Sequence, residues 1–204
     1  MSSGNQLDQL ASDIERSAAQ SRSPFVVAID GGSGAGKSTL AAWLAKRLDA
    51  LMISGDDFFS GGVTLRSDPA SVLAEVCIDW RSLEQVLRTL STNGQAHFLP
   101  FDWEAFDGSK CSDPILLKVR PIIIVEGVYS ARPELRELVD FSILVDIPKD
   151  LRTRRLVARE GEIGAWERQW HRAEDWYFEK RARREDFDVV VMSDSSGSIT
   201  MIRH

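Results

Sequence analysis

A glycine-rich segment of nine residues has the side chains and the spacing needed to hold phosphate groups. It matches the pattern G-x-x-x-x-G-K-[ST] and consists of Gly31, Gly32, Ser33, Gly34, Ala35, Gly36, Lys37, Ser38 and Thr39. Glycines let a backbone wrap closely around a phosphate, whose charge the N–H groups and a following helix N-terminus would bind. Lys37 would reach the β- and γ-phosphates, and the Ser38 hydroxyl would bind Mg²⁺. The segment therefore predicts a nucleoside triphosphate site.

Carboxylates follow two short apolar runs of the sequence. Asp56 and Asp57 come just after one run, and Glu126 closes another, with Tyr129 shortly beyond it. In an open parallel sheet, ligands bind beyond the carboxyl ends of the strands, so these residues should face the same crevice as the glycine-rich segment. Asp56 could accept a hydroxyl proton, and Glu126 could bind Mg²⁺ or an acceptor. The alternatives are turn or helix-cap aspartates and a glutamate that faces solvent.

Three arginines are spaced to lie on one face of a helix. Arg152, Arg155 and Arg159 recur at i, i+3 and i+7. Phosphoryl transfer spreads negative charge over the transferred oxygens, and an arginine-bearing lid could neutralise it. The alternative is a solvated helix that is covered with salt bridges.

The tryptophans suggest an aromatic wall. Trp80 and Trp103 each follow an aspartate, an arrangement that suits a sugar or a nucleoside because the ring stacks while the carboxylate binds hydroxyls. Core packing is the alternative, and it is the favoured interpretation for Trp166 and Trp170.

The hydrophobic pattern predicts one α/β domain over residues 24–204, preceded by an N-terminal helical extension over residues 1–23. Five apolar runs separated by helical segments indicate a parallel sheet that is covered on both faces, and they lie at 25–29, 51–53, 122–125, 141–145 and 189–192. The predicted helices span 39–48, 81–90, 150–159 and 165–184.

Composition narrows the class of protein. The chain has 204 residues, of which 43% are hydrophobic and 27% charged, and such a composition is typical of a globular domain. It has no apolar run of membrane-spanning length and no secretory signal pattern, so we expect a cytoplasmic protein without a membrane partner. Cys77 and Cys111 are too few for a disulfide framework or a four-thiolate zinc site. The net charge of −6 argues against a nucleic-acid partner.

A phosphate loop alone does not distinguish a kinase from a GTPase or an ATP-driven motor. GTPases usually read guanine with an Asn-Lys-x-Asp segment, which neither Asn5 nor Asn93 opens. The chain is also short for a motor with accessory parts. A small-molecule kinase is the leading hypothesis, and a regulator that binds ATP and a partner without phosphorylating a small molecule is the alternative.

The sequence resembles the uridine kinase and phosphoribulokinase-like family of P-loop small-molecule kinases over about residues 24 to 192. The resemblance is carried, in family order, by residues 31–39, 56–59 (DDFF), 100–102 (PFD), 125–127 (VEG) and the arginines from Arg152 onward. It implies the P-loop NTPase fold, a three-layer α/β/α structure with a five-stranded parallel sheet and an arginine-bearing helical lid at about 150–184. It also implies ATP and Mg²⁺ as cofactors and transfer of the γ-phosphoryl group to a hydroxyl.

The resemblance also implies roles for single residues. Asp56 matches the catalytic base, Asp79 falls where nucleoside kinases hold ribose hydroxyls, and Phe101-Asp102 falls where they carry a Tyr-Asp pair. The expected catalytic residues are Lys37, Asp56, Arg152, Arg155 and Arg159, and the expected metal ligands are Ser38, Asp56 and Glu126. The expected acceptor contacts are Asp57, Phe59, Asp79, Phe101, Asp102, Glu126 and Tyr129.

This sequence departs from the family pattern on the acceptor side. Phe59 and Phe101 stand where nucleoside kinases often have tyrosine, and the segment after Asp102 lacks the histidine expected near a pyrimidine base. The expected acceptor is a nucleoside that resembles uridine or cytidine, with a sugar or a pantothenate-like alcohol as the alternative. Homo-oligomerisation is left open.

Overall fold

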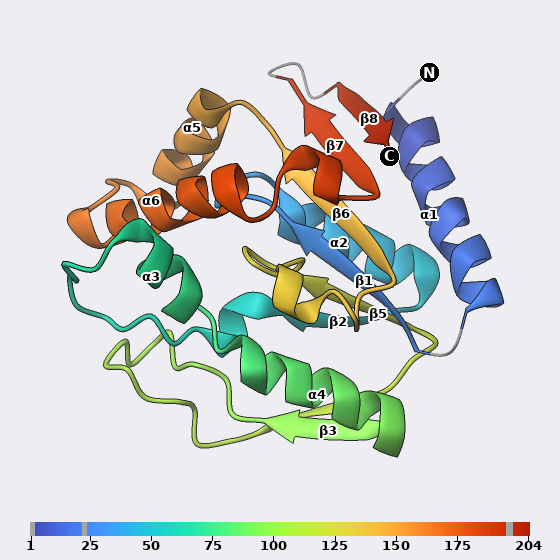
Figure 1. Ribbon diagram of the computed structural model, residues 1–204, viewed down its shortest axis with the longest axis horizontal. Coiled ribbons are helices and arrows are strands. Elements are labelled where there is room, and N and C mark those ends of the chain that lie inside the picture. The colour runs from blue at the N-terminus through green and yellow to red at the C-terminus, as the bar shows by residue number, and fades with distance from the viewer. Residues whose placement is uncertain (1–2, 22–23, 195–197) are drawn as a thin grey trace.

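The computed structural model describes residues 3–21, 24–194 and 198–204 as a layered α/β structure (Figure 1). The main sheet has the strand order β2-β5-β1-β6-β7-β8, and these strands span, in that order, Leu51–Ser54, Ile122–Glu126, Phe25–Asp30, Phe141–Asp146, Val189–Ser193 and Ile199–Arg203. The first five are parallel, which confirms the predicted parallel sheet. The sixth, β8, was not predicted and pairs antiparallel with β7 at one edge.

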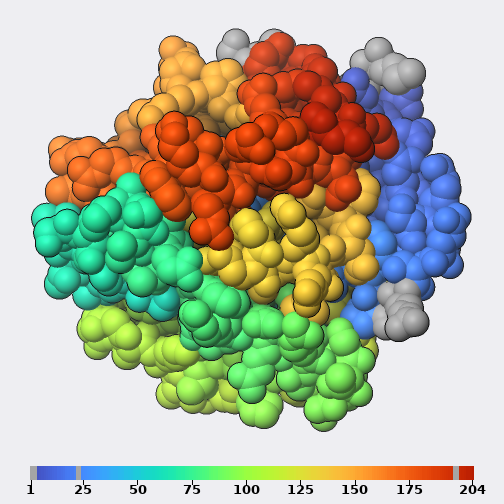
Figure 2. Space-filling view, viewed as in Figure 1, coloured from blue at the N-terminus to red at the C-terminus, as the bar shows by residue number. Residues whose placement is uncertain are grey.

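Helices lie on both faces of this sheet. They are α1 (Ser3–Gln20), α2 (Lys37–Leu48), α3 (Ala70–Val76), α4 (Trp80–Asn93), α5 (Lys149–Glu160) and α6 (Ala165–Lys180). Short 3-10 turns, η1 (Gly55–Phe58), η2 (Pro133–Leu135) and η3 (Arg184–Asp186), join some of the elements, and β3 (Gln95–Phe98) pairs with β4 (Ile115–Lys118) in a separate hairpin. Figure 2 shows α6 packed directly over α3 on the viewed face. Among the described residues, no helix combines the length and apolarity needed to cross a membrane.

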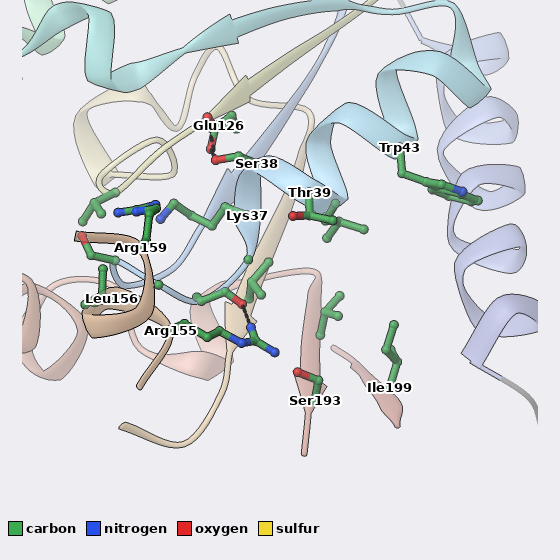
Figure 3. A pocket seen from close by; sticks show the side chains of 18 of the residues that line it. Lys37, Ser38, Thr39, Trp43, Glu126, Arg155, Leu156, Arg159, Ser193 and Ile199 are labelled. Carbon is green, nitrogen blue, oxygen red and sulfur yellow. Dashed lines mark hydrogen bonds between the residues drawn. The ribbon is translucent and has the colours of Figure 1, made fainter. Parts of the chain in front are cut away.

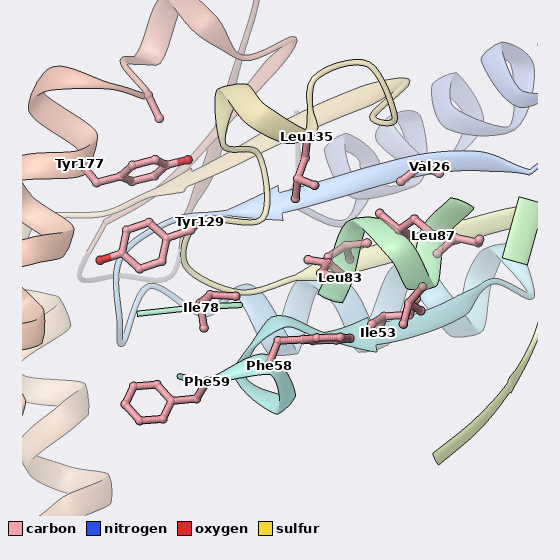
Figure 4. Close-up of a cluster of buried hydrophobic side chains, with 14 of the residues drawn as sticks. Val26, Ile53, Phe58, Phe59, Ile78, Leu83, Leu87, Tyr129, Leu135 and Tyr177 are labelled. Atoms are coloured by element: carbon pink, nitrogen blue, oxygen red, sulfur yellow. The ribbon is translucent and has the colours of Figure 1, made fainter. Parts of the chain in front are cut away.

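Alternate residues of each central strand face two separate hydrophobic cores. In β1, Val26 belongs to the core that includes residues of α3, α4 and α6 (Figure 4), whereas Val27 and Ile29 belong to the core that includes residues of α1 and α2. All six β1 residues are buried, which explains the continuous apolar run in the sequence. In α1, Leu10 and Ile14 are fully buried in the second core. The ends of the predicted 1–23 segment, residues 1–2 and 22–23, lie outside the described residues.

Several elements differ from the sequence predictions. The helix predicted over 165–184 ends at Lys180, because the backbone N–H groups of Arg181 and Ala182 both bond to the Tyr177 carbonyl and the chain then turns away. The hairpin and α3 were not predicted because they are short and the hairpin strands are half exposed, so their pattern is weak.

The register of the sheet sets the level at which its strands end. In β5, Glu126 is opposite Ile29 of β1 on one side and Ser54 of β2 on the other. The segments that follow these strands, including the glycine-rich loop and η1, therefore begin at the same edge of the sheet.

Candidate active site

The glycine-rich loop connects β1 to α2, as its motif predicts. Gly31 has φ 146° because the chain turns sharply after β1, and a Cβ atom there would lie 2.4 Å from the Val145 carbonyl oxygen. Gly34 and Gly36 also have positive φ values of 78° and 103°, and α2 begins directly after Gly36, at Lys37. The backbone thus has the shape that close approach to a phosphate requires.

Asp30 anchors the start of the loop through hydrogen bonds. It is fully buried, and the sequence analysis did not single it out. Its Oδ1 accepts hydrogen bonds from the backbone N–H groups of Gly31 (2.8 Å) and Tyr129 (3.0 Å). Its Oδ2 accepts from the Ala131 N–H (3.0 Å) and the Tyr177 hydroxyl (2.9 Å). Burial raises the pKa of Asp30 to about 6, although these hydrogen bonds oppose the rise. The signal in the sequence is an acidic residue at the end of a buried strand, because a buried carboxylate must be stabilised by hydrogen-bond donors or a cation.

A cavity of about 570 Å³, here called the donor cavity, opens beside the loop and α2 (Figure 3). Lys37, Ser38 and Glu126 line it, and the Ser38 Oγ lies 3.2 and 3.3 Å from the two carboxylate oxygens of Glu126. Burial raises the pKa of Glu126, an effect that the nearby Lys37 ammonium opposes. Val191 and Ile199, from β7 and β8, form part of the far wall.

The predicted row of arginines divides into two groups. Arg155 and Arg159 line the donor cavity, and the Arg155 guanidinium donates to the Ala35 carbonyl oxygen (3.0 Å). Arg152 instead packs against the loop itself, where its Nε donates to the Ser33 carbonyl oxygen (3.1 Å). A Cβ on Gly32 would lie 2.2 Å from the Arg152 Nη1. Arg152 therefore supports the loop, whereas the other two arginines face the space beside it.

Glu174 connects α6 to the loop and was missed by the sequence analysis. Its carboxylate, buried in the structure, accepts hydrogen bonds from the Ser33 N–H (2.8 Å) and the Ser33 hydroxyl (2.5 Å). It also pairs with Arg152 at 3.4 Å. Its position four residues after Trp170, on the buried face of α6, is the only signal that the sequence carries.

A second cavity of about 610 Å³, here called the acceptor cavity, is lined in part by η1. Asp57, Phe59 and Tyr129 line it, as do Trp166 and Trp170, for which core packing was expected. Trp170 does both, because it is only 5% exposed and still borders the cavity. Burial and the neighbouring Asp56 raise the pKa of Asp57.

The two cavities meet. Asp56 and Arg159 line both of them, together with Ser33, Val128 and Leu156. A ligand in each cavity would therefore face the same carboxylate and the same guanidinium.

Four predicted acceptor residues do not line the acceptor cavity: Glu126 lines the donor cavity instead, and the other three are Asp79, Phe101 and Asp102. Asp79 caps α4, because its carboxylate accepts from the Ser82 N–H (3.1 Å) and hydroxyl (2.6 Å). Asp102 holds its own turn by accepting the Glu104 and Ala105 N–H groups at 3.0 and 2.9 Å. Phe101 is buried behind Phe59, with the two ring centroids 5.0 Å apart. The two aspartates therefore stabilise their own segments, and Phe101 packs against a residue of the wall.

Comparison with known proteins adds independent information. Uridine kinase of Clostridium botulinum (strain Kyoto / Type A2) is 29% identical over 150 residues, which cover 67% of this chain and 69% of that protein. Uridine-cytidine kinase B of Dictyostelium discoideum is 27% identical over 150 residues, which cover 69% of this chain and 60% of that protein. The solved structure of a possible uridine kinase from Bacillus stearothermophilus has a TM-score of 0.69 and 25% identity, and the match covers 91% of this chain and 97% of that one.

The family comparison covers most of the domain. Residues 26–188 match the phosphoribulokinase/uridine kinase family, a span that contains the loop, both cavity-lining carboxylates of η1 and the arginines of α5. The fold of the solved relative and the match along the chain agree, and on this evidence the chain belongs to the phosphoribulokinase/uridine kinase family of P-loop kinases.

Proposed function

We propose that this protein is an ATP-dependent kinase that transfers the γ-phosphoryl group to a hydroxyl of a small molecule. The observation that carries this proposal is the junction of the two cavities, where Asp56 and Arg159 line both. A triphosphate held by the loop would extend toward this junction, and an acceptor in the second cavity would reach it from the opposite side. Holding the two reactants in this way supplies much of the catalysis of phosphoryl transfer.

The charged residues around the loop and the junction then have distinct roles. Asp56 would accept the proton of the attacking hydroxyl. Lys37, Arg155 and Arg159 would offset the negative charge that develops on the transferred group. Arg152 would act through the loop, because it contacts the Ser33 carbonyl rather than the cavity.

The donor cavity also fits Mg²⁺. The Ser38 hydroxyl and the Glu126 carboxylate place oxygen atoms side by side, and Asp56 lines the same cavity. Mg²⁺ usually binds one or two carboxylates and keeps several waters. It therefore does not need three or more clustered His, Cys, Asp or Glu residues, and the described part of the chain has no such cluster. Ser38 and Glu126 would hold the ion and Asp56 would contact one of its waters, and the bound ion would help to neutralise the phosphates.

A nucleoside is the acceptor class that the relatives favour. The two relatives named above are a uridine kinase and a uridine-cytidine kinase, and the aromatic wall of the acceptor cavity suits a flat base. A sugar or a pantothenate-like alcohol is the alternative, because Asp79 and Asp102 are already bonded within the protein.

An ADP-release assay with Mg-ATP tests this proposal. The acceptors are uridine, cytidine, deoxynucleosides, pantothenate and simple sugars, and the variants are Asp56→Asn and the exposed control Asp113→Asn. We expect Asp56→Asn to lower kcat by about 10²–10⁴-fold, as is usual for loss of a general base. ATP binding should stay close to that of the wild type, and Asp113→Asn should behave as the wild type.

Two results would count against the proposal. Full activity of Asp56→Asn would remove Asp56 from the role of base. ATP binding without ADP release for any acceptor would favour a nucleotide-binding regulator instead of a kinase.

A further inference from the structure

The two cavities differ strongly in charge. The donor cavity has three cationic side chains, Lys37, Arg155 and Arg159, against the carboxylates of Asp56 and Glu126. Among the described residues that line it, the acceptor cavity has the opposite balance, because its basic side chains are Arg159 and His171 and its carboxylates are Asp56, Asp57, Glu160, Glu162, Glu167 and Glu174. An anionic acceptor, such as a sugar phosphate or a carboxylate, would meet repulsion in this cavity.

Most of these carboxylates have no salt-bridge partner in the part of the chain that the structure describes. Glu174 pairs with Arg152, and Glu160 pairs with Arg159. Among the described residues, Asp57, Glu162 and Glu167 form no salt bridge, and neither does Asp56. The pair with Glu160 also offsets the single arginine charge that faces the cavity. A ligand that enters the cavity therefore encounters carboxylates whose charge is not neutralised.

The wall of the cavity is aromatic. Phe59 lies at its centre, with its ring centroid 5.1 Å from that of Trp103, 5.8 Å from that of Trp166 and 5.6 Å from that of Trp170. The indole N–H of Trp103 donates to the Asp56 carbonyl and that of Trp166 to the Gly62 carbonyl, so both polar edges are occupied. Aromatic faces carry negative electrostatic potential and attract cations within about 6 Å.

Two polar atoms of the wall are still without partners. The Tyr129 hydroxyl and the Trp170 indole N–H belong to side chains that are only 2% and 5% exposed, and within the described residues neither atom has a hydrogen-bond partner. Figure 4 shows Tyr129, Ile78 and Phe59 in the same buried cluster, and all three also line the acceptor cavity. Buried polar atoms without partners are uncommon, and a bound ligand could supply hydrogen bonds to them.

We infer that the acceptor is a ring-bearing alcohol with a positively charged nitrogen, either a protonated amine or a quaternary ammonium, and with no anionic group. This inference rests on the proposed kinase function and narrows its substrate class. The aromatic faces and the unpaired carboxylates bind the cation, while Asp56 at the junction receives the hydroxyl. Electrostatic selection of this kind would exclude phosphorylated and carboxylated alcohols from the site.

Three matched probes test the charge preference in the wild-type protein with Mg-ADP bound. They are the para-hydroxymethyl derivatives of phenyltrimethylammonium, of tert-butylbenzene and of benzoate, which carry a positive charge, no charge and a negative charge; the first two have the same shape, and the third has the same ring and alcohol. Tryptophan fluorescence measures their affinity, since Trp103, Trp166 and Trp170 line the cavity. We expect the cation to bind at least about tenfold more tightly than its neutral isostere, and the anion to bind most weakly.

Charge variants locate the effect. Glu162→Gln and Glu167→Gln should each weaken binding of the cation by about three- to tenfold and leave the neutral probe nearly unchanged. Glu137→Gln removes the same charge from an exposed site outside the cavity and is the matched control. Equal affinity for the three probes, no binding of any of them, or an equal loss for cation and neutral probe would overturn the inference.

ADP release with uridine and the same probes separates this inference from the proposed function. Turnover of uridine that is more efficient than that of the cation would preserve the kinase and refute the charge preference. Tight binding of the cation without ADP release from any acceptor would support the charge preference and refute the kinase.

Discussion

Replacement of Glu174 by glutamine should destabilise the contact between α6 and the phosphate loop. The Glu174 carboxylate accepts two hydrogen bonds from Ser33, and an amide would keep one acceptor oxygen while turning an N–H₂ donor toward the second donor. A hydrogen bond to a charged group contributes about 1.5–3 kcal/mol, and Arg152 would also lose a charged partner. Because removal of a buried charge offsets part of this loss, we expect the free energy of unfolding to fall by about 2–3 kcal/mol.

Urea unfolding of a double-mutant cycle measures the interaction. Ser33→Ala removes only the hydroxyl bond and should lower the free energy of unfolding by about 1–2 kcal/mol. The double variant should lose less than the sum of the single variants, by about 1–2 kcal/mol, because both changes remove the same hydrogen bond. Glu179→Gln, at an exposed position of the same helix, is the control and should change stability by less than about 0.5 kcal/mol. Additive losses within about 0.5 kcal/mol would refute the coupling.

Three further predictions concern the residues around the loop. Gly31→Ala should lower the free energy of unfolding by about 2–4 kcal/mol, because φ 146° and the Val145 carbonyl leave no room for a Cβ; thermal unfolding tests this, and an unchanged midpoint would contradict it. Asp30→Asn should destabilise the protein more than Tyr177→Phe does in the same assay, because asparagine cannot accept all four bonds whereas phenylalanine removes one; equal losses would show that the remaining bonds contribute little. Burial raises the pKa of Glu126 above its usual 4.5, so the acidic limb of a plot of kcat/KM against pH should lie above that value. The limb should move to lower pH as the Mg²⁺ concentration rises, because protons and the metal compete for the carboxylate. A limb whose position does not depend on Mg²⁺ would remove Glu126 from the metal site.

Local sequence signals were sufficient for the parts of this protein that short-range geometry controls. The loop from Gly31 to Thr39 could be recognised because glycines occupy the positions with positive φ and because the lysine and serine follow at fixed spacing. The five parallel strands could be recognised because burial on both faces demands continuous apolar runs. In contrast, β8 has alternate residues exposed and so lacks a continuous apolar run. Its antiparallel pairing with β7 could not be predicted from a local sequence pattern.

Among the carboxylates, residue type alone could not separate ligand contacts from structural caps. Asp79 and Asp102 accept hydrogen bonds from backbone N–H groups of their own segments. Asp56 is the same residue type, but it lies where the two cavities meet. Asp30 and Glu174 were passed over because their partners lie 99 and 141 residues away in the chain. Only the packed structure brings such groups within hydrogen-bonding distance.

The charge of the acceptor cavity is the clearest property that only the tertiary structure decided. Its acidic residues come from η1, from the end of α5 and from the region of α6, and Trp103 joins them from the loop that follows β3. The sequence by itself determined that a phosphate-binding loop sits at the end of a parallel sheet, because that motif is contiguous. The structure decided what lies opposite the loop, because electrostatic potential depends on distances in space rather than on positions along the chain.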